Sequence, residues 1–198
     1  MYNNIIGRTV PAFSERGFLM KTRIVALLLV AAIACSVFAG CEGHQTDADD
    51  PTQGGTITFA EPTYKSFYVD GMELKLPDRF QREDSNGNIG FFDGTYAVFL
   101  TREAFTVYPY LQDMSLEEYG NDILNASGID ATLKVIDGLY CFEYEAYSLD
   151  KTTKHNYFAV LFKSNKACWV VQFAAPFWNA SPMRSKFISW AKMIKIRD

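Results

Sequence analysis

The sequence predicts an α+β fold, in which a central antiparallel β-sheet of about six to eight strands has helices packed on both faces. Three observations predict it. Asp-Gly pairs recur between runs of β-branched and aromatic residues, at Asp70-Gly71, Asp93-Gly94 and Asp137-Gly138, and such a pair supplies the positive φ angles of a tight hairpin. Two segments have the periodicity of amphipathic helices. Aromatic residues make up 15% of the chain, which indicates heavy packing.

The Asp-Gly pairs place the expected strands. We expect paired strands at 65–69 and 72–76, 89–92 and 95–101, and 132–136 and 139–147, followed by strands at 156–162 and 167–174. Segments 96–100 and 157–162 are apolar on both faces, which is typical of central strands. In 140–145 the aromatic residues alternate with Glu143 and Glu145, so we expect that strand to be half-solvated.

Two helices are expected on the two faces of this sheet. The first begins at a capping box, Ser115 with Glu118 three residues later, and ends near Gly128. The second begins at Ser181-Pro182, with proline at the first helical position. Its apolar stripe consists of Met183, Phe187, Trp190, Ala191 and Ile194.

The N-terminal region has the order of an export signal. Lys21 and Arg23 form a short basic start, 24–39 is an uncharged apolar run, and Ala39-Gly40 precede Cys41. This order resembles the lipobox of bacterial lipoproteins, and the resemblance implies cleavage before Cys41 and a covalent diacylglycerol on its thiol. A transmembrane helix is the alternative, but the run is shorter than the roughly 20 apolar residues of a span. Cys35 lies inside the apolar run, so Cys41 is preferred as the modified residue.

The expected signal divides the chain into four parts. Residues 1–19 are interpreted as a mis-assigned start or a disordered extension, 20–40 as the signal peptide and 41–55 as the lipidated cysteine with a flexible acidic tether. Residues 56–198 are interpreted as a single α+β domain. The acyl chains would hold this domain at the extracytoplasmic face of the bacterial cell membrane, or at the outer membrane of a two-membrane host.

The charge and the cysteines limit the partners. Removing residues 1–40 takes away four basic residues and one acidic residue, which changes the formal net charge from −4 to −7. Such an acidic chain is a poor candidate for nucleic acid. An extracytoplasmic address permits a disulfide between Cys141 and Cys168. However, one strand is expected between them, which would place their backbones about 10 Å apart, so two buried free thiols are the preferred alternative.

The residues for catalysis or metal binding are sparse. His155 is the only histidine of the expected domain, and we interpret it as an exposed residue at a strand end rather than as a partner of Cys141 or Cys168 in nucleophilic catalysis. Glu143 and Glu145 could form a carboxylate pair, but nothing indicates a cleft between them. The spacings fit no metal motif and no phosphate-binding loop. We therefore expect no enzyme activity, no metal and no cofactor apart from the lipid.

The exposed aromatic residues are the candidate contacts for a ligand or partner. Phe177 and Trp178 lie between the last long strand and the last helix, and Tyr108 and Tyr110 precede the first helix. Aromatic side chains in such loops either cap the core or anchor a partner, and the sequence leaves both interpretations open. The C-terminal helix has a basic polar face that could also rest against anionic lipid headgroups.

Three segments carry a family resemblance. Leu74-Lys75-Leu76-Pro77 with Phe80, the helix start Ser115–Tyr119, and Trp169-Val170-Val171-Gln172-Phe173 are similar to the PsbP-like α/β/α sandwich superfamily, which includes lipoproteins of the DcrB type. The resemblance implies a non-catalytic binding or accessory module of the cell envelope. The alternatives are a small-molecule or glycan receptor that uses aromatic residues near Trp178, and an envelope hydrolase.

Overall fold

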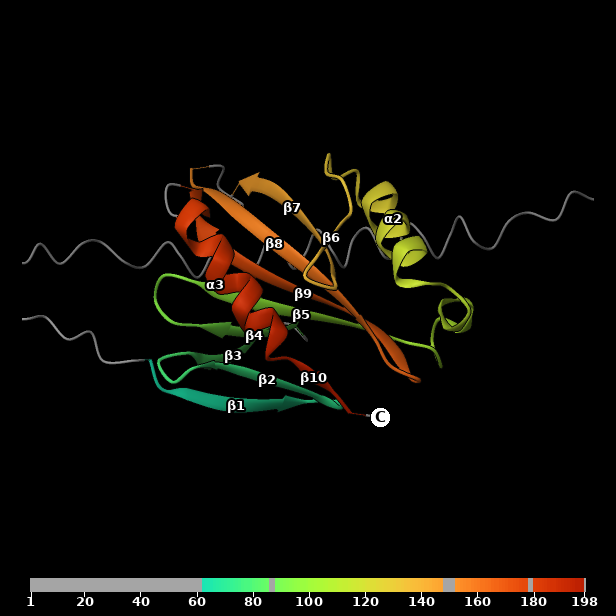
Figure 1. Ribbon diagram of the computed structural model, residues 1–198, viewed down its shortest axis with the longest axis horizontal. Coiled ribbons are helices and arrows are strands. Elements are labelled where there is room, and N and C mark those ends of the chain that lie inside the picture. The colour runs from blue at the N-terminus through green and yellow to red at the C-terminus, as the bar shows by residue number, and fades with distance from the viewer. Residues whose placement is uncertain (1–61, 86–87, 148–151, 178–179, 198) are drawn as a thin grey trace, which may run out of the picture.

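The computed structural model describes residues 62–85, 88–147, 152–177 and 180–197 (Figure 1). Cys41, the expected signal and tether, and Trp178 lie outside these residues. The described residues form ten strands, two α-helices and a short 3₁₀ helix. Their bounds are β1 (Tyr64–Val69), β2 (Met72–Pro77), β3 (Gln81–Ser85), β4 (Asn88–Phe92), β5 (Ala97–Ala104), η2 (Pro109–Gln112), α2 (Leu116–Ser127), β6 (Lys134–Ile136), β7 (Leu139–Tyr147), β8 (Lys154–Lys163), β9 (Ala167–Pro176), α3 (Ala180–Lys192) and β10 (Lys195–Ile196).

The strands form two antiparallel sheets. The larger has the order β3-β4-β5-β9-β8-β7-β6, and the smaller has the order β1-β2-β10. The prediction of an α+β fold around an antiparallel sheet is confirmed. The second sheet and the strands β3 and β10 were not predicted, because β3 is polar throughout and β10 has two residues.

Alternating residues of the central strands divide the core between the two faces of the large sheet. Trp169 and Val171 of β9 belong to the cluster that contains α3, whereas Cys168 and Val170 belong to the cluster that contains α2. Both helices therefore cover the sheet, on opposite faces, as predicted. The small sheet packs on the α3 face, where residues of β2 join the same cluster.

Aromatic packing fixes α3. The Phe187 ring stacks on Phe173 of β9 with a centroid distance of 5.4 Å, and Trp190 meets Phe80 edge-on, also at 5.4 Å. Each of these four side chains is nearly fully buried. Burial of such rings contributes most of the hydrophobic free energy of a core of this kind.

The predicted capping box starts α2. The Ser115 hydroxyl accepts the Glu118 N–H at 3.1 Å, and the Glu118 carboxylate accepts the Ser115 N–H at 2.8 Å. Further along, the Tyr119 hydroxyl donates to the buried carboxylate of Glu103 at 2.6 Å. The cap and this hydrogen bond hold the start of the helix against β5.

The three Asp-Gly pairs do not form the same turn. Asp70-Gly71 and Asp137-Gly138 have positive φ at both positions and form two-residue hairpins. At the second pair only Gly94 has positive φ, and β5 begins at Ala97 rather than at residue 95. The turn is longer because the Asp93 carboxylate accepts the N–H groups of Thr95 and Tyr96.

Candidate functional site

The predicted aromatic contact at the end of β9 is an exposed ring beside an ion pair. Phe177 is 49% exposed, and the Lys154 ammonium lies 4.6 Å from the centroid of its ring. Lys154 also pairs with Glu145, and the hydrogen bond that its ammonium donates to this carboxylate raises the pKa of Lys154. The Phe177 backbone carbonyl accepts the Asn156 amide at 3.3 Å. The structure therefore presents one apolar ring within a charged border.

The second predicted aromatic contact lies around η2. The Tyr108 and Tyr110 rings meet edge-on at 6.4 Å; Tyr110 is 38% exposed, while Tyr108 packs partly against the α2 cluster. The Lys163 ammonium donates to the carbonyls of Gln112 and Met114 and so fixes the segment between η2 and α2.

The structure does not bring these two aromatic groups together. Phe177 lies beside Lys154, the first residue of β8, whereas the η2 segment is bound by Lys163, the last. A strand of this length separates its two ends by roughly 30 Å. The aromatic residues singled out from the sequence are two surfaces and not one site.

The prediction that His155 is exposed is wrong. Its side chain is fully buried, because β8 begins at Lys154 and His155 already lies between Ala146 of β7 and Pro176 of β9. Burial lowers the pKa of the imidazole, since the charged form loses its hydration. The imidazole is therefore enclosed between β7 and β9 rather than presented at the surface.

Neither cysteine can react together with His155. In the register of β7 and β8, Cys141 lies opposite Val160, whose side chain points to the other face of β8 than His155 does. Cys168 lies opposite Lys163, which is roughly 26 Å along β8 from His155. Both cysteines are free and buried, with β8 between their strands. Burial also raises the pKa of the Cys141 thiol, and nearby Glu143 adds to this shift, so the nucleophilic thiolate is disfavoured.

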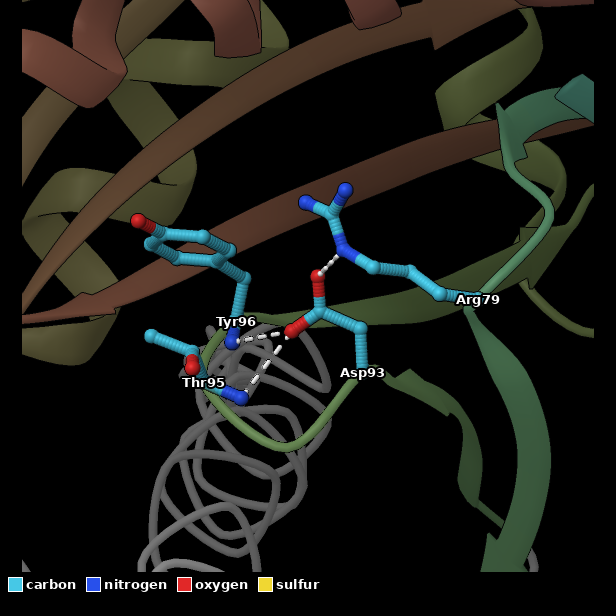
Figure 2. Close-up of polar contacts among 4 residues, drawn as sticks. All are labelled: Arg79, Asp93, Thr95 and Tyr96. Carbon is cyan, nitrogen blue, oxygen red and sulfur yellow. Dashed lines mark hydrogen bonds and ion pairs between the residues drawn. The ribbon is translucent and has the colours of Figure 1, made fainter. Parts of the chain in front are cut away.

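A buried carboxylate links the two sheets (Figure 2). The Asp93 side chain is 1% exposed, and its carboxylate accepts the Arg79 Nε at 2.7 Å and the N–H groups of Thr95 and Tyr96 at 3.0 and 2.7 Å. Arg79 lies in the connection between β2 and β3, so the contact joins the small sheet to the β4–β5 turn. Both oxygens of the carboxylate accept hydrogen bonds from the protein, which indicates a structural role.

The structure also contains a hollow that the sequence did not reveal. It has a volume of about 370 Å³ and lies between α2, the segment that leads into β6, and the start of β7. Its polar wall is formed by Glu117, Asn121 and Asn125 of α2, which follow one another at intervals of one helical turn. Leu124 and Leu133 belong to its apolar lining, and Lys134 and Val135 of β6 close the other side. The volume is within the range of binding sites for small ligands or side chains.

One signal in the sequence could have located this wall. Asparagine is a weak helix former because its amide competes for backbone hydrogen bonds. Asn121 lies in the middle of an otherwise well-capped helix and Asn125 in its last turn, at the spacing that places them on one face. A polar stripe of poor helix formers is better explained by contact than by helix stability.

Two general features of the described residues bear on the site. No group of three or more His, Cys, Asp or Glu side chains in this part of the chain is placed to hold a metal ion. Among the helices of the same residues, none combines the length and the apolar character needed to cross a membrane.

No family model matches the chain, and no curated protein matches it. The chain is similar in structure to a protein of Bacteroides thetaiotaomicron, with a TM-score of 0.47, 14% identity and 68% of this chain covered, although it spans only 48% of that protein. It is also similar to the cyanobacterial PsbP of Synechocystis, with a TM-score of 0.46, 14% identity and coverage of 73% and 97%. The Ran-binding protein Mog1p of Saccharomyces cerevisiae has a TM-score of 0.46 and 8% identity, with coverage of 70% and 97%. At such identities the likeness concerns the arrangement of the backbone and not the side chains of a site.

Proposed function

We propose that this chain is a membrane-anchored extracytoplasmic lipoprotein that acts as a non-catalytic binding or accessory module of the cell envelope. The observation that carries the proposal is the order of basic start, apolar run, small residues and cysteine that ends at Cys41. A diacylglyceryl group on this cysteine would supply the two chains that stable anchoring requires. The polar segment 42–55 would then connect the anchor to the sheet domain.

The chemistry of the domain favours binding over catalysis. Its single histidine is buried, and its two cysteines are distant from it or on the opposite face. The surface does offer contact groups, namely the exposed Phe177 ring and the polar wall of the hollow beside α2. These are features of recognition, and the domain would meet its partner at the membrane surface.

Replacement of the proposed lipid acceptor tests the anchor. We expect Cys41→Ser to lose incorporation of labelled palmitate and to leave the membrane fraction, because the thiol that accepts the diacylglycerol is gone. Cys35→Ser is the matched control and should keep both label and location, since Cys35 lies within the expected signal. A Cys41→Ser protein that is still acylated would contradict the proposal.

Cross-linking in intact cells tests the accessory role. A photo-reactive group at position 177 or 121 should give a reproducible cross-linked protein, whereas the same group at exposed Lys166 should not. Absence of any protein adduct at both positions would favour the small-molecule receptor instead.

A further inference from the structure

The hollow beside α2 lies at an unpaired edge of the large sheet. Within the part of the chain that the structure describes, β6 pairs with β7 on one side and is the last strand of the sheet on the other. An unpaired edge presents backbone N–H and C=O groups that can pair with another chain. The hollow and this edge share the residues Lys134 and Val135.

The register shows which backbone groups face outward. Ile136 and Leu139 flank the two-residue turn and form a hydrogen-bonded pair, so the next pair, Val135 with Tyr140, is the non-hydrogen-bonded one. The N–H and C=O of Val135 therefore point away from β7. Its side chain is 60% exposed, which leaves this position open to an approaching strand.

The wall of the hollow has the groups that recognise a peptide backbone. A carboxamide contains both a donor and an acceptor and so complements a main-chain amide. Among the described residues, the side-chain amides of Asn121 and Asn125 have no hydrogen-bond partner, and the Glu117 carboxylate has no ion-pair partner. Glu117 adds a negative charge to this wall, whereas the side chain of Lys134, which is the register partner of Cys141 in the α3 cluster, lies on the other face of the sheet.

We propose that the β6 edge and the hollow beside α2 bind an extended polypeptide segment of a partner protein, by strand addition. The segment pairs its backbone with Val135, directs alternate side chains over the Leu124 and Leu133 lining, and is hydrogen-bonded by Asn121 and Asn125. A polypeptide fits better than a sugar, because Tyr140 is the only aromatic residue of the lining. This inference specifies the partner class of the proposed binding module but does not depend on the lipid anchor.

A displayed heptapeptide library is the probe for this site. The full chain, purified in mild detergent, is used to select peptides, and their affinities are then measured by fluorescence polarisation. Val135→Pro removes the outward N–H without removing a bond to β7, and should weaken the selected peptides at least about tenfold. Val135→Thr keeps the N–H and should bind as the wild type does.

Variants of α2 test the wall separately. Asn121→Ala with Asn125→Ala should weaken the same peptides at least about tenfold, while Gln112→Ala, an exposed carboxamide outside the hollow, should have no effect. Alanine favours helix more than asparagine does, so a loss of binding would not reflect a melted helix; circular dichroism checks each variant.

Several results would overturn the inference. They are failure to enrich any peptide, equal binding by Val135→Pro and wild type, or a wild-type dimer that Val135→Pro dissociates while no peptide is enriched. None of these results bears on acylation at Cys41, so failure of this inference is distinguishable from failure of the proposed anchor.

Discussion

The two ends of the seven-stranded sheet are built differently. At the closed end, defined as β3 and β4 with the small sheet β1-β2-β10, the edge strand carries only polar and charged residues. Arg82 and Asp84 of β3 form an ion pair at 2.8 Å. Charges on three of the five residues of β3 discourage pairing with other chains, whereas β6 carries one charge, that of Lys134. At the open end, defined as β6 and β7 with α2, the edge is three residues long and carries an exposed valine beside a hollow.

The difference indicates that the closed end stabilises the sheet and the open end presents groups for contact. The closed end is tied down by contacts between distant segments, such as Phe67 of β1 with Phe91 of β4 at 4.6 Å and Arg79 with Asp93. The open end keeps backbone groups and carboxamides available. Because the closed end stabilises the sheet, the open end can present polar groups that take no part in the packing of the fold.

The two Asp-Gly hairpins should show the largest difference between the ends. A Cβ at Gly71 would lie 2.7 Å from the backbone carbonyl oxygen of Arg197, whereas a Cβ at Gly138 would have nothing within 4 Å. Both glycines have positive φ, so alanine costs roughly 1–2 kcal/mol at either position. Gly71→Ala adds an overpacking cost of roughly 1–3 kcal/mol, because Arg197 is held by a backbone hydrogen bond to Gly71 and by Glu73.

Urea unfolding measures this difference. We expect Gly71→Ala to lose about 2–5 kcal/mol of the free energy of unfolding and Gly138→Ala about 1–2 kcal/mol. Equal losses would mean that β10 moves aside freely and that the closed end is not as tightly packed as the contacts indicate.

The ion pairs at the two ends should differ next. The Asp93 carboxylate is 1% exposed, but at the Asp137 turn of the open end both partners of the Lys192–Asp137 pair are about half exposed, at 48% and 56%. Arg79→Ala removes a charged donor from a buried acceptor and should cost about 1–3 kcal/mol. Lys192→Ala should cost less than about 1 kcal/mol, since water replaces the lysine. A comparable loss in both variants, by thermal or urea unfolding, would remove this distinction between the ends.

The parts predicted from the sequence are those with local chemical signals. The Ser115 capping box and the Asp70-Gly71 hairpin depend on neighbouring residues. The segments that are apolar on both faces predict the central strands directly. The small sheet could not be predicted in this way, because β10 is two residues whose pairing depends on contacts with β2 far along the chain. The hollow depends on tertiary packing too, although the asparagines of α2 were visible.

His155 shows why strand ends are difficult to predict. Polar neighbours such as Lys154 and Asn156 suggested the beginning of a strand in solvent. However, pairing on both sides extends β8 to Lys154, and register with β7 and β9 places the imidazole inside. One or two residues at a strand end thus change an exposed histidine into a buried one.

The smallest predicted effect concerns the buried imidazole of His155 in β8, which lies between β7 and β9. Its pKa in the folded protein lies below the usual 6.5. As the pH falls, the unfolded chain takes up the proton first, so stability is full above about pH 6.5 and is lost as the pH drops further. Urea unfolding between pH 7.5 and 5.5 should show this loss in the wild type and a smaller one in His155→Gln, while Arg79→Ala, altered only at the closed end, should keep the wild-type slope. An unchanged slope in His155→Gln would mean that the imidazole is protonated as readily in the folded sheet as in the unfolded chain, and that β8 opens at this position.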